Sequence, residues 1–358
     1  MSNGNIKLTG ICKKIKSKNI LSNVNIEINS GEFVTILGPS GAGKTTVLRI
    51  IAGFDNPTQG LVSLNGKDIT KIPSNKRNIG MLFQNYALFP HMTVAENVAF
   101  PLKIRKMSRS DIEDKVKAAL DMVKLSDLAE RLPKELSGGQ QQRAAMARSL
   151  VFNPSVLLLD EPMAALDKQL RKYMQLEIKQ LHNELGITTI SVTHDQEEAL
   201  TMATKVCVLR NGSVEQISNP RSIYDKPKNT FIASFIGETN IIETTILERN
   251  GADYKVRLFG KYDLYFKNEN YLYPVGEKIY ISIRPEKFNI VEGDYEGFKI
   301  KGTVTQSIFV GEALKIKVRV ADDAEIDAKV FITSGMSINV GDTVYLSVNN
   351  GDIVTLRE

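Results

Sequence analysis

Strand-length apolar runs and helical periodicities alternate along the first part of the chain. Residues 33–37 form an apolar run that predicts a buried strand, and residues 46–52 predict the start of a helix behind it. Residues 156–159 are a second apolar run of strand length. Because this alternation continues to about Ser234, we expect an α/β core with a parallel sheet covered by helices.

Between residues 86 and 152 the pattern becomes mainly helical. Ser110 and Glu113 have the spacing of a capping box at a helix start. Apolar side chains follow with the period of one helix face, at Ile112, Val116, Leu120 and Val123. We therefore expect a helical subdomain over about 86–152, inserted into the α/β core.

The sequence pattern changes again near residue 236. Beyond it, short segments of alternating apolar and polar residues predict strands in place of helices. Turn signals such as Asn250 followed by Gly251 separate these strands. Residues 313–320 place apolar side chains on one face and basic ones on the other. We expect one domain over 1–236 and an all-β, OB-like barrel domain over 237–358.

Composition and charge exclude several classes of protein. The 358 residues suffice for two or three domains with a large core, and hydrophobic and charged shares of 42% and 24% are ordinary for globular chains. The apolar runs are too short to span a bilayer, and residues 1–5 do not resemble a secretion signal. The net charge of +5 is spread along the chain, so we expect no nucleic acid partner.

One glycine-rich segment carries the clearest chemistry. Residues 38–45 fit G-x-x-x-x-G-K-S/T, the loop that holds a nucleotide triphosphate between a strand and a helix. Glycines let backbone N–H groups turn toward an anion, and the following helix directs its positive dipole end at the phosphates. Lys44 would reach the β- and γ-phosphates, and Thr45 would hold Mg²⁺. The predicted nucleotide-binding residues here are Gly38, Pro39, Ser40, Gly41, Ala42, Gly43, Lys44, Thr45 and Thr46.

Two acidic residues follow the second buried run. Ligands of parallel sheets bind at the carboxyl ends of the strands, where Asp160 and Glu161 lie. Asp160 can complete the Mg²⁺ shell, and Glu161 is placed to polarise an attacking water.

A second anion site precedes the helix expected from residue 141. A serine and two glycines at a helix start offer backbone N–H groups to a phosphate. This segment adds Ser137, Gly138, Gly139 and Gln140 to the predicted nucleotide-binding residues.

The order of these segments resembles the ATP-binding subunit of an ABC (ATP-binding cassette) transporter. Residues 38–45 match its Walker A loop, 136–140 its signature and 159–161 its Walker B strand. The remaining family motifs correspond to Gln84 as the Q-loop, Ala165, Leu166 and Asp167 as the D-loop, and His194 as the switch histidine. Thr193 and Gln196, which flank this histidine, also fit a capping box.

The resemblance implies ATP hydrolysis by a head-to-tail pair of subunits. Each ATP would lie between one phosphate loop and the partner's signature, so Ser137 and Gly139 would act in trans. Gln84 would sense the γ-phosphate or Mg²⁺, His194 would contact the γ-phosphate, and Asp167 would organise the dimer interface. The resemblance also implies two membrane permease subunits, an extracytoplasmic solute-binding protein and a place at the cytoplasmic face of the membrane.

The C-terminal region and several short segments narrow the expected transport role. Residues 283–286 read I-R-P-E, which resembles the TOBE domain found on importer ATPases. Residues 84–93 are similar to importers of polyamines, iron(III) and phosphonates. Residues 161–168 and 174–177 resemble spermidine/putrescine cassettes most, and residues 193–202 and 235–240 agree with this resemblance. We expect polyamine uptake, with iron(III) or 2-aminoethylphosphonate as alternatives, and residues 89–101 as the permease-facing surface.

A soluble ABC protein of DNA repair or translation is the alternative from another class. Repair ATPases separate the phosphate loop and the signature by long coiled coils, and this chain has no sustained heptads there. Translation proteins usually carry two cassettes, and this chain has one set of motifs. One position departs from the family pattern: Ile15 stands where these subunits usually carry an aromatic residue that stacks on adenine.

Overall fold

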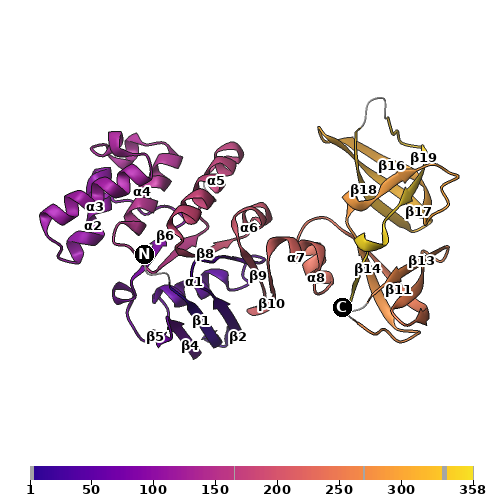
Figure 1. Ribbon diagram of the computed structural model, residues 1–358, viewed down its shortest axis with the longest axis horizontal. Coiled ribbons are helices and arrows are strands. Elements are labelled where there is room, and N and C mark those ends of the chain that lie inside the picture. Colours follow the sequence, from indigo (N-terminus) through magenta and orange to yellow (C-terminus); the bar gives the residue numbers. More distant parts are fainter. Residues whose placement is uncertain (1–3, 165, 269–270, 333–336, 358) are drawn as a thin grey trace. The chain divides into compact units, whose positions relative to one another are not determined.

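The computed structural model describes residues 4–164, 166–268, 271–332 and 337–357. The chain divides into two compact units, Met1–Pro220 and Arg221–Glu358, which are shown in Figure 1. The domain boundary expected after residue 236 falls inside the second unit, just after helix α8 (Thr230–Phe235). That boundary stays a prediction.

A six-stranded sheet forms the centre of the first unit. Its neighbours are parallel except for the antiparallel edge strand β10. The central strands β3 and β8 are buried along their whole length, as expected when helices cover both faces. In spatial order the strands are β10 (Ser213–Ser218), β9 (Lys205–Arg210), β3 (Phe33–Leu37), β8 (Thr188–Thr193), β7 (Val156–Asp160) and β6 (Ile79–Leu82). The helices connecting these strands are α1 (Lys44–Ala52), α5 (Lys168–Leu185) and α6 (Gln196–Met202).

A second, antiparallel sheet in the first unit was not distinguished from the parallel one by the sequence pattern. It contributes buried side chains such as Ile6, Leu8 and Ile26 to the same hydrophobic core as α1 and the central strands. Its strands lie in the order β2 (Lys18–Ile28), β1 (Ile6–Ile15), β4 (Gln59–Leu64) and β5 (Lys67–Asp68).

The predicted helical subdomain contains α2 (Val94–Ile104), α3 (Arg109–Met122) and α4 (Gly138–Leu150). In Figure 1 these helices gather at one end of the first unit, away from the antiparallel sheet. Val98 and Leu102 from α2 share a core with Val116 and Leu120 from α3 and with Ala144 from α4. The period-3.6 pattern therefore identified the packed face of α3 correctly.

The capping box predicted at Ser110 is wrong. The helix begins two residues earlier, and Ser108 is its N-cap: the Ser108 hydroxyl accepts from the backbone N–H of Asp111 at 3.2 Å and donates to the Asp111 carboxylate at 2.7 Å. Ser110 lies exposed in the first turn. Because serine favours both positions, spacing alone did not choose between them.

The second unit packs two five-stranded antiparallel sheets around one hydrophobic core. Helices α7 (Pro220–Asp225) and α8 precede them. One sheet has the order β13 (Tyr262–Lys267), β12 (Asp253–Leu258), β11 (Asn240–Asn250), β14 (Lys278–Ile283) and β20 (Val354–Leu356). The other has the order β15 (Asn289–Val291), β19 (Thr343–Ser347), β16 (Ile300–Phe309), β17 (Ala313–Ala321) and β18 (Ala324–Phe331).

Arg284, in the I-R-P-E segment, ties the two short helices to the end of β14. It is 6% exposed, and its guanidinium donates to the carbonyl oxygens of Tyr224, Ala233 and Glu238 at 2.9–3.0 Å. The guanidinium also lies 4.1 Å from the centre of the Tyr224 ring. Burial lowers the pKa of Arg284, but these acceptors and the ring accommodate its charge.

Short 3₁₀ helices complete the connections of both units: η1 (Ser74–Lys76), η2 (Ser126–Leu128), η3 (Pro133–Glu135), η4 (Pro285–Lys287) and η5 (Asn350–Asp352).

The observed cap of α3 makes a direct prediction. Ser108→Ala removes the side-chain acceptor for the first turn and should lower the free energy of unfolding by about 1 kcal/mol. Ser110→Ala, two residues further along the chain, is the matched control and should change the free energy of unfolding little. Urea unfolding followed by circular dichroism measures both, and an equal loss in the two variants would contradict the assignment of the cap.

Candidate functional site

The phosphate loop, residues 38–43, connects β3 to α1. Gly43 is the N-cap of α1 in a left-handed conformation, with φ at 100° and no side-chain cap. None of the described residues in the first helical turn is acidic. The first backbone N–H groups of the helix are thus left for an anion, in the positive field of the helix dipole.

Two of the loop glycines are required by close contacts. A Cβ on Gly38 would lie 2.2 Å from the carbonyl oxygen of Leu209 in β9. A Cβ on Gly43 would lie 2.6 Å from a methyl group of Leu21, in addition to its unfavourable φ. The glycines that the motif prescribes therefore also let the loop pack against β9 of the parallel sheet and β2 of the antiparallel sheet.

Lys44 is 7% exposed, and its ammonium group points back into the loop. It donates to the carbonyl oxygens of Gly38 at 2.8 Å and Pro39 at 3.0 Å. Burial lowers the pKa of Lys44, while the nearby Glu161 carboxylate acts in the opposite direction. Thr45 is exposed at the start of α1 and Thr46 is half-buried, so both lie at the mouth of the loop.

Strand register places Glu161 beside His194. Asp160 at the end of β7 pairs with Val192 of β8, and the backbone N–H of Glu161 donates to the Val192 carbonyl at 2.9 Å. His194 follows two positions later on the same side of the sheet. Glu161 has a φ of 44°, a region that costs a residue with a side chain about 1–3 kcal/mol and is common at functional sites.

The Glu161 carboxylate is the meeting point of three predicted site residues. One oxygen accepts from the Gln84 amide at 3.3 Å, and the other lies 3.3 Å from Nδ1 of His194. The His194 side chain is 64% exposed, so it faces the open side of the site. Burial and the Glu161 charge raise the pKa of Asp160, and Arg49 opposes the shift.

The second predicted anion site forms a capping box. Ser137 is the N-cap of α4: its hydroxyl accepts from the Gln140 backbone N–H at 3.4 Å, and its own N–H donates to the Gln140 side chain at 2.8 Å. Gly138 and Gly139 lie close to Leu166 and Leu170, because a Cβ on either would lie 3.3–3.4 Å from those side chains. Among the described residues, no hydrogen bond joins Ser137 or Gln140 to Lys44 or Glu161.

Asp167 is the N-cap of α5. Its carboxylate accepts from the backbone N–H groups of Gln169 at 3.0 Å and Leu170 at 2.9 Å. Ala165, the first residue of the predicted D-loop, lies outside the described residues. The capping box expected at Thr193 and Gln196 is wrong, because the Asp195 carboxylate caps α6 instead.

Sequence reasoning missed two residues that hold the segment after Gln84. Arg148, near the end of α4, donates to the carbonyl oxygens of Tyr86 and Ala87, both at 2.7 Å. Asn97 of α2 is fully buried and bonds both backbone groups of Phe89 at 2.8–3.1 Å. The Thr93 capping box at the start of α2 is the local signal near Asn97, whereas the Arg148 contacts join positions 61 and 62 residues apart and leave no local pattern.

Comparison with known proteins adds independent findings. Residues 21–164 match the family model described as ABC transporter, and residues 281–356 match the TOBE domain. The chain is 49% identical over 313 residues to the spermidine/putrescine import ATP-binding protein PotA of Vibrio cholerae, covering 87% of this chain and 82% of that one. It is 43% identical over 350 residues to the protein of the same name from Thermobifida fusca, covering 96% and 91%.

The chain belongs to the ABC transporter family.

Solved structures agree with this assignment. The dimeric structure of a bacterial ABC transporter cassette is 37% identical, with a TM-score of 0.54, and covers 60% of this chain and 99% of its own. The same cassette in a post-hydrolysis state, bound to ADP and phosphate, aligns with a TM-score of 0.53. The predicted ABC family membership, the α/β fold with a TOBE domain and the ATPase class are confirmed.

The membrane-spanning parts of an ABC transporter have no counterpart in the helices described here. Across the described residues, every helix is too short or too polar to cross a bilayer.

The family-related position Ile15 ends β1 with a side chain that is 49% exposed. A tyrosine there can stack on a nucleobase, a contact worth about 1–3 kcal/mol, which isoleucine supports only with its aliphatic side. We therefore expect Ile15→Tyr to lower the Kd for ATP about tenfold in a calorimetric titration.

Ile104→Tyr, at an isoleucine on α2 that is 61% exposed, is the matched control and should leave the Kd for ATP unchanged. Equal affinities for the Ile15→Tyr variant and the original chain would contradict the prediction.

Proposed function

We propose that this chain hydrolyses ATP to drive polyamine uptake through separate membrane permease subunits. The cargo proposal is supported by relatives that are 43–49% identical over most of the chain and are named for spermidine/putrescine import. The TOBE match at residues 281–356 is consistent with an importer.

The observation that carries the chemistry is the position of the Glu161 carboxylate. Gln84 contacts one of its oxygens and His194 the other, at the carboxyl end of β7 and within the electrostatic range of Lys44. Glu161 would accept a proton from water as the water oxygen bonds to the γ-phosphorus. The bond from that phosphorus to the bridging oxygen breaks, which leaves ADP and inorganic phosphate.

The phosphate loop would bind and orient the triphosphate. Lys44 now donates to two loop carbonyl oxygens, and phosphate oxygens are stronger acceptors for a buried ammonium group. The uncapped start of α1 adds N–H donors, so the loop stabilises negative charge that develops during phosphoryl transfer. His194 is exposed beside Glu161 and would donate to the γ-phosphate.

Mg²⁺ fits the oxygen donors at this edge of the sheet. We assign it the hydroxyl of Thr45, the carboxylate of Asp160 and the amide oxygen of Gln84, a hard-oxygen set of the kind that Mg²⁺ prefers. Burial and the Glu161 charge raise the pKa of Asp160, and a bound cation would favour its ionised form. When bound, Mg²⁺ would neutralise charge on the β- and γ-phosphates.

A second copy of the chain would complete each site. Ser137, Gly138, Gly139 and Gln140 form a helix start that bonds to none of Lys44, Gln84, Glu161 or His194 among the described residues, so it is available to a nucleotide held by a partner. Asp167 lies at the start of the adjacent helix and would face the same interface. The dimeric structure of the related cassette is consistent with this arrangement.

Residues 89–101 are the proposed surface for the permease. Arg148 and Asn97 hold the backbone of residues 86–89 between Gln84 and this surface, so a change at the nucleotide can reach it through residues 85–89. The subunit would then lie at the cytoplasmic face of the membrane. An extracytoplasmic solute-binding protein would deliver the cargo to the permease from the other side.

Replacing the proposed base tests the chemistry. In Glu161→Gln the new side chain has the same shape and can still accept a hydrogen bond from the Gln84 amide, but it cannot accept a proton from water. ATP hydrolysis should therefore fall at least about a hundredfold. ATP-bound dimers should accumulate because the nucleotide is not consumed. Phosphate release and size-exclusion chromatography with ATP measure the two effects.

Glu113→Gln, on the exposed face of α3, is the matched control and should keep full turnover. Retained turnover in Glu161→Gln would remove Glu161 as the base, even if the variant still bound ATP.

Co-purification tests the cargo separately. The subunit isolated from native membranes should bring with it a permease and a solute-binding protein that binds spermidine or putrescine. A partner that binds iron(III) or a phosphonate would overturn the polyamine proposal and leave the ATPase unaffected. Recovery without any membrane partner would instead favour a soluble ABC ATPase.

A further inference from the structure

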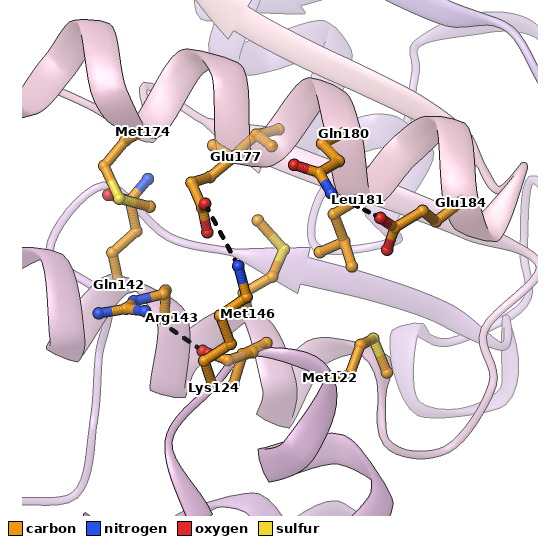
Figure 2. A pocket seen from close by; sticks show the side chains of 12 residues that line it. Met122, Lys124, Gln142, Arg143, Met146, Met174, Glu177, Gln180, Leu181 and Glu184 are labelled. Carbon is orange, nitrogen blue, oxygen red and sulfur yellow. Dashed lines mark hydrogen bonds and ion pairs between the residues drawn. The ribbon is translucent and has the colours of Figure 1, made fainter.

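A pocket lies between α4, α5 and the end of α3, outside the proposed nucleotide site (Figure 2). It contains about 540 Å³ of empty space, part of it open to solvent. None of the residues assigned above to the ABC motifs lines it.

Unpartnered donors line this pocket. Gln142 of α4 is fully buried, yet neither its amide nitrogen nor its amide oxygen has a hydrogen-bond partner. Figure 2 shows its amide reaching from α4 toward Met174 on α5. The buried Nε of the neighbouring Arg143 is also unpartnered. A buried amide without partners destabilises the fold, and a ligand that hydrogen-bonds to it removes this cost.

The acidic side chains of the pocket already have partners. Glu177 accepts from the Tyr173 hydroxyl at 3.1 Å and lies 3.8 Å from the Lys124 ammonium group. Glu184 accepts from the Gln180 amide at 2.7 Å. The unpartnered groups are the amide nitrogen and amide oxygen of Gln142 and the Nε of Arg143. A carboxylate or carboxamide oxygen can accept from both nitrogens, whereas an alkylammonium group can only donate to the Gln142 oxygen.

The rest of the lining suits a flexible apolar body. Met122, Met146 and Met174 come from three different helices and line the pocket together with Ile178 and Leu181. Methionine side chains adapt their shape to a ligand at little cost, so the pocket can accept more than one apolar outline.

The pocket also touches the signature. The sulfur of Met174 lies 3.7 Å from the position of a Cβ on Gly139, and Leu170 of the same helix lies closer still, at 3.3 Å. A molecule that moves Met174 or spreads α4 from α5 therefore acts on the helix start that carries residues 137–140.

We propose that this pocket binds a small amphipathic molecule, with a carboxylate or carboxamide oxygen at Gln142 and Arg143 and an apolar body among the methionines. Occupancy lowers ATP hydrolysis by displacing the signature helix. The binding site stands on the pocket alone, whereas the effect on turnover rests on the proposed function.

Binding is tested with octanoate and octanamide on the full chain carrying ¹³C-labelled methionine methyl groups. Both probes should shift the NMR signals of Met122, Met146 and Met174, while Met92 and Met202, which lie outside the pocket, serve as internal references. Octylamine, which has the same chain but no acceptor oxygen, should bind at least about tenfold more weakly. Equal shifts with octylamine, or shifts of all methionines alike, would overturn the proposed site.

Variants distinguish the polar contact at Gln142 from non-specific hydrophobic binding. Gln142→Leu removes the unpartnered amide, so the protein should unfold at the same temperature or higher while its Kd for octanamide rises about tenfold. Gln59→Leu, at an exposed position in β4, is the matched control and should bind like the original chain. Unchanged affinity in Gln142→Leu would overturn the proposal.

Turnover is measured on the same samples. Saturating octanamide should lower phosphate release at least about threefold in the original chain and leave Gln142→Leu unaffected. Binding without any change in turnover would overturn the regulatory part alone. A chain without basal ATPase activity would overturn the proposed function, and the NMR result would still decide the binding site.

Discussion

The parallel register of β3, β7 and β8 is the constraint on which the site depends. These strands are buried on both faces and pair in one register, so their carboxyl ends reach the same edge of the sheet. Lys44 follows the first strand, Glu161 the second and His194 the third. A shift of one residue between β7 and β8 would separate the Glu161 carboxylate from the imidazole beside it.

Helix α4 contacts three regions of the first unit: the signature, the segment after Gln84 and the pocket beside α5. Its N-terminus carries the Ser137 capping box, and Arg148 near its other end holds the carbonyl groups that follow Gln84. Gln142, whose side-chain amide has no hydrogen-bond partner, lies between these two ends. It lines the pocket together with Met174, which packs near Gly139 of the signature. A rigid helix transmits a displacement along its length, so one element links the segment after Gln84, the residues of the signature and the pocket.

Local patterns predicted much of the fold and of the site. The apolar runs located β3 and β7, the period of 3.6 located the buried face of α3, and alternation located β17. The helix cap was misplaced from Ser108 to Ser110, because serines two positions apart are locally equivalent and packing chooses between them. The antiparallel sheet of β1, β2, β4 and β5 was missed as a separate layer, because strand pairing depends on partners far away in the sequence.

The sequence by itself determined which chemistry the chain carries, because glycines, a lysine and acidic residues at fixed spacings leave few alternatives for a phosphate loop. It also determined the order of the motifs, and with it the family. Only the tertiary structure decided that Glu161 is held between Gln84 and His194, that Arg148 supports the segment after Gln84, and that Gln142 is buried without a partner. Each of these depends on which strand ends and helix faces meet, and that is set by packing between residues distant in the chain.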